Sequence, residues 1–212
     1  MDAIFQQAME YLHVTLNKSD KIDDVEKLYR YEHSLRVAHI ARRIAEQEGQ
    51  DVLIATIGAI LHDVGKFDTD VNADHGRVSA DVAMGWLRTS GLTDKQIKDI
   101  HYCIAVHVDG KAGYEYENIP EADTVSDADN IDRFGVYRIY QTLQWDKADT
   151  TKALDLAAKY RERNPKLKHF KETYQLSTPT ANRMFQDNLQ IQVDFFDRLV
   201  IELQQTLGAD VK

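Results

Sequence analysis

The sequence predicts an all-α protein, and three observations support this fold class. Only 3 Pro and 10 Gly, the residues that interrupt helices, occur among 212 residues. Strand-like alternation of apolar and polar residues is rare, whereas apolar residues recur at three- and four-residue spacing along much of the chain. Hydrophobic residues make up 43% and charged residues 29%, the balance of a globular protein with a packed core. Since no repeat or linker interrupts the pattern, we expect a single domain over residues 1–212.

Apolar spacing predicts five helices in the first half of the chain. The segment 51–63 is apolar on almost every side, which is typical of a central, buried helix. Gly49 and Gly91 are expected to end the helices before them, and Thr93 or Asp94 to cap the helix that follows. The expected helices are 2–17, 33–48, 51–63, 76–90 and 93–107.

The second half of the chain is expected to continue the helical fold after a loop at 110–120, which Gly and Pro indicate. A helix over 147–161 and a basic, partly irregular connection over 165–176 follow. Thr178 is a suitable cap for the last helix, and Pro179 suits its first turn. The apolar stripe of this helix either closes the core or forms a homodimer face. The stripe consists of Phe185, Leu189, Phe196, Leu199, Val200, Leu203 and Leu207, up to Gly208.

The composition also narrows the class of protein. No window approaches the ~18 to 20 apolar residues of a membrane span, and the amino terminus lacks a secretion signal, so we expect a cytoplasmic protein without a membrane partner. The single cysteine, Cys103, cannot form an internal disulfide or a cysteine-rich zinc site, so His and carboxylate groups must hold any metal. The net charge of −9 argues against a nucleic acid polymer as partner but leaves room for a nucleotide in a small pocket.

Several polar side chains fall on predicted inward faces of helices. His33 lies on the apolar stripe of the second expected helix, and His62 and Asp63 come at the end of the central helix. After the loop, Asp129 and Asp132 lie on one apolar stripe. An ionised carboxylate on a core-facing surface is costly unless a cation or hydrogen-bond donors meet it. This last stripe consists of Val125, Asp129, Asp132 and Val136.

Two imidazoles and two carboxylates form a ligand set for a divalent ion such as Mn²⁺, Fe²⁺, Co²⁺, Ni²⁺, Zn²⁺ or Mg²⁺. Such an ion can activate a water molecule and neutralise phosphate charge. Each residue alone has a plainer explanation. His33 or His62 fits a packed core histidine, and Asp129 fits a helix cap or a partner of Arg36 or Arg133. The joint occurrence of four such groups on inward faces favours the metal site.

Three motifs resemble the HD superfamily of metal-dependent phosphohydrolases. They are H-x-x-R-V from His33, LHDVGK at 61–66 and SDADNID at 126–132. The resemblance covers about residues 30–145 and implies an HD-like helical bundle, followed by a C-terminal helical extension over about 147–208. It implies a set of metal ligands, namely His33, His62, Asp63 and Asp129. The stretches HGRVSA at 75–80 and DADNIDRFG at 127–135 are similar to a small bacterial branch, some of whose relatives hydrolyse nucleotides.

Some members of this superfamily bind two metal ions through additional histidines, which makes His75, His101 and His107 candidates here. His107 shares a helix face with apolar residues and precedes a loop, so an extra metal ligand, a phosphate contact and a buried structural histidine all fit. His75 begins a helix, where it caps the helix or lines a substrate pocket. His101 is less central. The sequence lacks the adjacent His-His pair of two-metal relatives, which puts a second ion in doubt.

Two further residues are candidates for catalysis alongside Asp63. Lys66 follows Asp63 by three residues, where its ammonium group can meet a substrate phosphate; the alternative is a solvated loop lysine. Asp132 can orient an imidazole or act as the base that activates water. Its alternative is a salt bridge with Arg133 or Arg36.

These observations predict a metal-dependent phosphohydrolase that cleaves a phosphoester or phosphoanhydride bond of a small phosphorylated substrate. That the substrate is a nucleotide is implied by the resemblance alone. Two alternatives stay open: a non-catalytic HD-type module that binds a nucleotide or phosphate, and a helical scaffold whose histidines pack in the core. The sequence contains no Gly-rich phosphate loop, G-x-S-x-G elbow or H-E-x-x-H motif, so the enzyme classes that depend on them have no local support.

Overall fold

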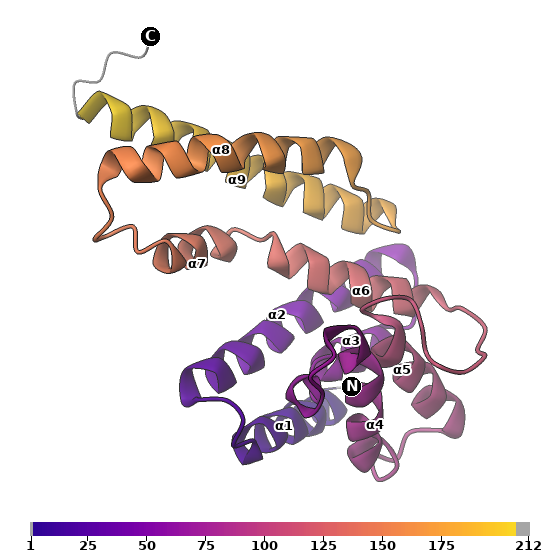
Figure 1. Ribbon diagram of the computed structural model, residues 1–212. Helices are drawn as coiled ribbons and strands as arrows, with labels where there is room; N and C mark the ends of the chain where they lie inside the picture. Colours follow the sequence, from indigo (N-terminus) through magenta and orange to yellow (C-terminus); the bar gives the residue numbers. More distant parts are fainter. Residues whose placement is uncertain (1, 207–212) are drawn as a thin grey trace. The chain divides into compact units, whose positions relative to one another are not determined.

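The computed structural model describes residues 2–206, and within that range the protein is all-α, as predicted (Figure 1). Strands are absent from the described residues. Two short 3-10 helices, η1 (Lys66–Asp68) and η2 (Asn72–Asp74), connect α3 to α4. The α-helices are α1 (Asp2–Lys18), α2 (Asp24–Glu48), α3 (Val52–Leu61), α4 (His75–Leu87), α5 (Asp94–Val106), α6 (Pro120–Arg133), α7 (Tyr137–Trp145), α8 (Ala153–Thr173) and α9 (Pro179–Thr206).

The chain divides into two compact units within α6, between Asn130 and Ile131. The first unit contains α1 to α5 and most of α6, and the second contains the end of α6 with α7, α8 and α9. The C-terminal extension was predicted to start near residue 147, which lies beyond α7, and no helix was predicted over α7 itself. The expectation of a single domain stays a prediction.

Helix α3 forms the centre of the first unit. Every residue from Ile54 to Leu61 is buried, and the helix packs against α1, α2, α4 and α5. The Asp51 side chain caps its start by accepting hydrogen bonds from the backbone N–H groups of Leu53 and Ile54, at 2.9 and 3.2 Å. A helix that is apolar on every side is stable only when neighbours cover every side, and the fold provides them. The residues directly after α3 therefore emerge inside the unit.

Helix α2 begins at Asp24, nine residues before the start that the apolar stripe predicted. Asp23 caps this start, since its carboxylate accepts a 2.8 Å hydrogen bond from the backbone N–H of Glu26. The first turns carry exposed apolar residues, with Val25 78% and Leu28 59% exposed, so no inward stripe marks them in the sequence. The helix ends as predicted, at Gly49.

Helix α5 starts with the predicted cap. Thr93 accepts a hydrogen bond from the backbone N–H of Gln96, and the Gln96 side chain accepts one from the backbone N–H of Thr93. Helix α4 starts at His75, one residue before the expected start, and ends at Leu87, three residues before the expected end. The loop between α5 and α6 ends where Pro120 opens α6.

The predicted stripe on α6 needs one correction. Val125 is fully buried, as expected, but Val136 lies beyond the end of the helix at Arg133 and is 50% exposed. Asp127, which the pattern placed off the stripe, is buried at 4% exposure. The inward face of α6 is therefore wider than the four-residue stripe indicated.

Helices α8 and α9 lie side by side in the second unit (Figure 1). The basic connection expected over 165–176 is wrong for most of its length, because α8 continues through Pro165 to Thr173. Asn164 and Leu167 keep a buried face there, and the Asn164 side-chain amide donates a 2.9 Å hydrogen bond to the backbone carbonyl of Val193 on α9. Packing against α9 thus outweighs the interior proline.

Helix α9 begins as predicted. The Thr178 hydroxyl accepts a 3.1 Å hydrogen bond from the backbone N–H of Ala181, and Pro179 is the first helical residue. Much of its apolar stripe is buried, including Phe185, Leu189, Phe196 and Val200. Leu207 and Gly208 lie outside the described residues. Whether the remaining surface of α9 forms a homodimer face stays a prediction.

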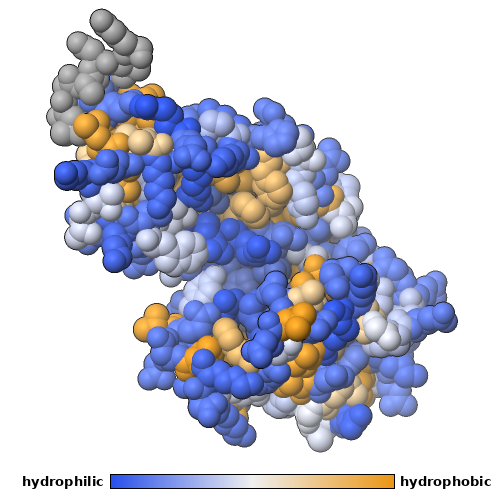
Figure 2. Space-filling view, viewed as in Figure 1, coloured by the Kyte–Doolittle hydropathy of each residue, from blue (hydrophilic) through white to orange (hydrophobic). Residues whose placement is uncertain are grey.

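Hydrophilic residues cover most of the face seen in Figure 2, and apolar atoms reach it in separate patches. Among the helices of residues 2–206, none combines the length and the hydropathy that crossing a bilayer requires.

Candidate metal centre

The four predicted ligands meet where α3 ends. His33 comes from α2, His62 and Asp63 directly follow α3, and Asp129 comes from α6. Nε2 of His33 lies 3.3 Å from Nε2 of His62, 3.2 Å from Oδ1 of Asp129 and 3.8 Å from Oδ2 of Asp63. Nε2 of His62 lies 3.7 Å from Oδ2 of Asp63 and 3.9 Å from Oδ1 of Asp129. The side chains form two overlapping groups whose ligand atoms lie within 4.8 Å of one another: His33, His62 and Asp129 form one, and His62, Asp63 and His107 form the other. His62 belongs to both groups.

The spacing of these atoms fits a shared ion. Ligand atoms about 2.1 Å from one ion lie roughly 3.0 Å apart at octahedral angles and roughly 3.4 Å apart at tetrahedral angles. The separations that involve Nε2 of His33 or His62 are 3.2 to 3.9 Å, at or slightly above these values. His62 is fully buried and the His33 and Asp63 side chains are each 3% exposed, whereas that of Asp129 is 19% exposed.

Backbone carbonyls fix the orientation of three histidines in this region. Nδ1 of His62 donates to the carbonyl of Ala59 at 2.8 Å, and Nδ1 of His107 donates to the carbonyl of Ile104 at 2.7 Å. Nδ1 of His75 donates in the same way to the carbonyl of Asn72. A carbonyl only accepts, so the proton of each neutral ring is on Nδ1 and the lone pair is on Nε2, which faces the centre. This is the tautomer that a metal ligand needs.

His75 and His107 face the other oxygen of Asp63. Nε2 of His75 lies 3.1 Å from Oδ1 of Asp63, and Nε2 of His107 lies 3.7 Å from the same atom. The second distance is too long for a hydrogen bond, and the buried Nε2 of His107 has no hydrogen-bond partner among the described residues. A buried lone pair without a donor indicates a site for a cation or a ligand proton. Both histidines thus extend the cluster around Asp63.

Two cationic side chains also reach Asp63. Nζ of Lys66 lies 3.1 and 3.0 Å from the two carboxylate oxygens, and Nη1 of Arg30 lies 3.4 Å from Oδ2. The Arg30 guanidinium lies over the rings of Tyr29 and Phe67, at 5.0 and 5.5 Å from their centroids. Arg30 is one helical turn before His33 and was not predicted, because the apolar stripe indicated a helix start at His33. An earlier helix start would have placed both residues on one face.

Burial and neighbouring charges shift the pKa values of three groups in the centre. Burial raises the pKa of the Asp63 carboxyl, but the nearby His62, His107, His75 and Lys66 together hold it well below its usual range. Burial also raises the pKa of the Asp129 carboxyl, but His33 and His62 outweigh this effect, so the pKa of Asp129 is lowered. Burial, with help from His107 and His33, lowers the pKa of His62 to about 4 despite Asp63 and Asp129. Near neutral pH the centre therefore holds two carboxylates and a neutral His62.

Two glycines permit the close packing that positions these side chains. A Cβ atom on Gly65 would lie 3.0 Å from backbone atoms of Ser79, and one on Gly76 would lie 2.7 Å from the carbonyl oxygen of Ala105. The backbone N–H of Gly65 also donates a 3.0 Å hydrogen bond to the Ser79 hydroxyl. The turn after α3 and the start of α4 can thus approach their neighbours closely enough to bring Lys66 and His75 to Asp63.

Other candidates lie elsewhere. Asp132 is buried on α6 one turn beyond Asp129, at the start of the second unit, and its catalytic role stays a prediction. His101 pairs with the Tyr114 hydroxyl at 2.7 Å and does not join the centre. His39, on the same helix as His33, is exposed.

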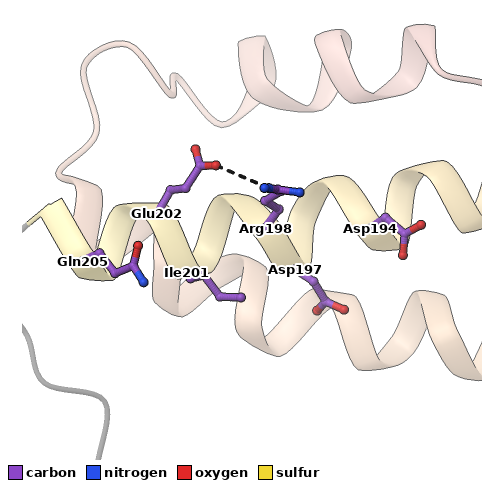
Figure 3. A pocket seen from close by; sticks show the side chains of 6 residues that line it. All are labelled: Asp194, Asp197, Arg198, Ile201, Glu202 and Gln205. Carbon is purple, nitrogen blue, oxygen red and sulfur yellow. Dashed lines mark ion pairs between the residues drawn. The ribbon is translucent and has the colours of Figure 1, made fainter.

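A groove along α9 does not resemble a phosphate site (Figure 3). Its only cationic side chain, Arg198, lies 3.7 Å from Glu202, and Asp197 is already paired with Lys168 at 2.7 Å. The carboxylates therefore outnumber the cations, which would repel an anionic ligand. Its lining residues are Asp194, Asp197, Arg198, Ile201, Glu202 and Gln205.

The fold and the centre together define an all-α protein with a buried His/Asp cluster suited to a divalent metal. Residues 30–133 match the sequence model of the HD domain. The chain belongs to the HD-domain superfamily. The matched range contains His33, His62, Asp63 and Asp129, as well as Lys66, His75 and His107.

Solved structures share the fold at low sequence identity. A predicted HD superfamily hydrolase from an uncultured Thermotogales bacterium is 21% identical, with a TM-score of 0.67 over 93% of this chain and 91% of that one. Bacillus subtilis YpgQ, solved in complex with ADP, is 18% identical, with a TM-score of 0.62 over 94% of this chain and 95% of that one. These similarities extend the structural match over both units.

The curated relatives match over a shorter segment. Ribonuclease Y of Treponema pallidum is 42% identical over 52 residues, which is 24% of this chain and 10% of that protein. Ribonuclease Y of Thermoanaerobacter pseudethanolicus is 33% identical over 78 residues, or 36% of this chain and 14% of that protein. This chain therefore spans about a tenth of the length of these relatives.

Replacing His33 by Ala should abolish tight metal binding, because it removes one of the convergent donor atoms. Metal content after purification in Mn²⁺ and desalting, measured by plasma mass spectrometry, should fall at least about tenfold, as is typical when a metal site loses a key interaction. The matched control is His39→Ala, which changes an exposed histidine on the same helix and should keep the metal. Equal metal content in the two variants would contradict the ligand assignment.

Chelation should destabilise the metal-loaded protein. An ion present at about a hundred times its Kd stabilises the folded state by about 2.7 kcal/mol. For a chain of this size, each kcal/mol shifts Tm by about 2–4 °C, so excess EDTA should lower Tm by roughly 5–10 °C. Scanning calorimetry measures this shift, and His33→Ala should show none. An unchanged Tm in protein that demonstrably carried metal would argue for a purely structural cluster.

Proposed function

We propose that the protein is a metal-dependent phosphohydrolase whose substrate is a nucleotide. The observation that carries the proposal is that donor atoms of His33, Asp63 and Asp129 lie within 3.9 Å of Nε2 of His62, with lysine and arginine side chains beside them. A structural role alone does not require several imidazole lone pairs and two carboxylates to face one another in a buried space.

The chain's own residues divide the work in this proposal. A divalent ion bound here supplies an activated water near neutral pH and neutralises phosphate charge. His33, His62, Asp63 and Asp129 hold that ion, and the carbonyl of Ala59 keeps Nε2 of His62 available to it. Because the pKa of His62 is lowered to about 4, protons do not compete with the ion for Nε2 of His62 near neutral pH.

The groups around Asp63 are placed to meet the substrate. Lys66 and Arg30 supply positive charge for phosphate oxygens, Arg30 as a planar fork and Lys66 as a point charge. His75 and His107 contact the phosphate or add ligands on the Oδ1 side of Asp63. The catalytic role predicted for Asp132 is not used in this proposal.

Two observations support a nucleotide rather than a polymer. YpgQ, which shares the fold, was crystallised with ADP, so this fold accommodates a nucleotide. The net charge of −9 disfavours the long-range attraction to a nucleic acid backbone on which polymer binding depends. The partial similarity to ribonuclease Y makes a short RNA the appropriate competing substrate to test.

Phosphate release from a panel of nucleoside mono-, di- and triphosphates, with Mn²⁺, tests the proposal. We expect release from at least one nucleotide, and loss of at least about a thousandfold in kcat/KM in Asp63→Asn, because that change removes a ligand to the ion that activates water. A single-stranded RNA oligonucleotide is the parallel substrate. Tight nucleotide binding without any phosphate release would favour the regulatory module, and cleavage of RNA alone would replace the nucleotide as substrate.

Arg30→Ala should weaken substrate binding more than metal binding. Losing one charge-assisted contact to a phosphate is worth about 1.5–3 kcal/mol, so kcat/KM should fall roughly ten- to a hundredfold. Metal content should stay at the level of the unmodified protein, since Arg30 is not a ligand. The control is Arg42→Ala, which alters a partly exposed arginine on the same helix that pairs with Glu46. Unchanged kinetics in Arg30→Ala would remove Arg30 from the site.

A further inference from the structure

A second cavity lies on the first unit, between α4, α5 and the loop that leads to α6. It is an open groove of about 370 Å³, within the ~300–1,000 Å³ range of small-molecule sites. Its walls are almost entirely apolar, and two tyrosine rings from the loop form one side. The lining residues are Met84, Ile97, Lys98, His101, Tyr114 and Tyr116.

Hydrogen bonds hold the loop and its two tyrosines in place. The Tyr116 hydroxyl donates a 2.6 Å hydrogen bond to Oδ1 of the buried Asp99, and a 2.7 Å hydrogen bond joins the Tyr114 hydroxyl to Nδ1 of His101. Arg77 fastens the loop from the α4 side by donating to Oδ1 of Asp109 and to the carbonyl of Lys111, at 3.0 and 2.8 Å. Side-chain hydrogen bonds therefore fix the wall of the groove that the loop forms.

The anchoring leaves carbon surfaces facing the groove. Both tyrosine hydroxyls are engaged, and the rings of Tyr114 and Tyr116 stand at 82° with centroids 6.3 Å apart. Perpendicular rings offer one face and one edge to a planar guest, which is the geometry that aromatic pairs favour. Tyr114 remains 44% exposed, so part of its ring is free for such contact.

Lys98 is the cationic side chain of the groove, and the Asp81 carboxylate lies beside it at 3.5 Å from Nε2 of His101. Lys98 is exposed on its wall and forms no ion pair with another residue of the described chain. Burial raises the pKa of Tyr114 to about 12, and burial with the Asp99 hydrogen bond raises that of Tyr116 to about 12, so both rings stay neutral beside Lys98. An anionic group on a guest would meet Lys98 without repulsion from the tyrosines.

We propose that this groove binds a small planar aromatic anion, with its ring against Tyr114 and Tyr116 and its negative group at Lys98. The site is separate from the metal centre, although both use α5. His101, in the groove, precedes His107 by six residues, which is about 9 Å along the helix and about 120° around it. The proposal does not depend on the proposed hydrolase activity.

Binding of 2-naphthoate to EDTA-treated protein, followed by fluorescence anisotropy, tests the proposal. We expect saturable binding with a sub-millimolar Kd that Tyr114→Ala weakens by about three- to tenfold, the range of one aromatic contact. Tyr114→Phe should preserve binding because it keeps the ring. Lys98→Gln should weaken 2-naphthoate by about fivefold but leave the neutral 2-naphthalenemethanol unchanged, since an exposed charge contributes about 1 kcal/mol at most.

The matched control is Tyr140→Ala, which removes a tyrosine that is 53% exposed in the second unit and should not affect binding. AMP is added as a competitor to identify the source of the aromatic anion: displacement of 2-naphthoate indicates nucleotides, and its absence indicates non-nucleotide aromatic acids. Binding that fails to saturate, or that is equal in Tyr114→Ala and Tyr140→Ala, would overturn the proposal. Because Tyr114 lies in a loop and is 44% exposed, its substitution should leave the helical circular dichroism spectrum unchanged.

Discussion

The buried carboxylate of Asp63 sets the main constraint on the first unit. Its side chain is only 3% exposed, and an uncompensated charge at that depth costs several kcal/mol. The fold offsets this cost from several directions: Lys66 follows from the next turn, Arg30 arrives from α2, and His75 and His107 arrive from the facing ends of α4 and α5. The close approaches at Gly65 and Gly76 serve the same end. Many of the contacts between these elements thus surround the carboxylate of Asp63.

Helix α3 explains why that charge is inside at all. Because the helix is apolar on every side, its carboxyl end lies within the unit. The next two residues, His62 and Asp63, are therefore buried as well. His62 continues the helix as its C-terminal cap residue, and its Nδ1 donates to the carbonyl of Ala59, one of the carbonyls that a helix end leaves without an intrahelical partner. One hydrogen bond thereby satisfies the helix end and directs Nε2 toward His33. The same device recurs at the end of α5, where His107 donates to the carbonyl of Ile104.

Sequence periodicity placed His33, Asp129 and the residues after α3 on inward faces because all of them follow buried stripes, and their role as metal ligands stays a prediction. Periodicity failed where burial does not repeat with the helical period. Arg30 was missed because the first turns of α2 are solvated, and the continuation of α8 through Pro165 was missed because tertiary packing against α9 outweighs local propensity. Tyr114 and Tyr116 were assigned to a loop, correctly, but no sequence pattern shows that Asp99 and His101 would hold their rings against α5.

The contacts of Asp63 also suggest how the centre can change between ion-free and ion-bound forms. Lys66 and Arg30 hold the same carboxylate oxygens that the proposed metal ligand set requires. Three histidines are already oriented by backbone carbonyls, so binding a cation costs them little reorganisation, whereas the two cationic side chains must give up part of their hold on Asp63. Their charges then remain beside the centre without a full partner, and a phosphate group is the natural replacement. Occupancy by metal and affinity for an anionic substrate would therefore be linked through a single carboxylate, with each favouring the other.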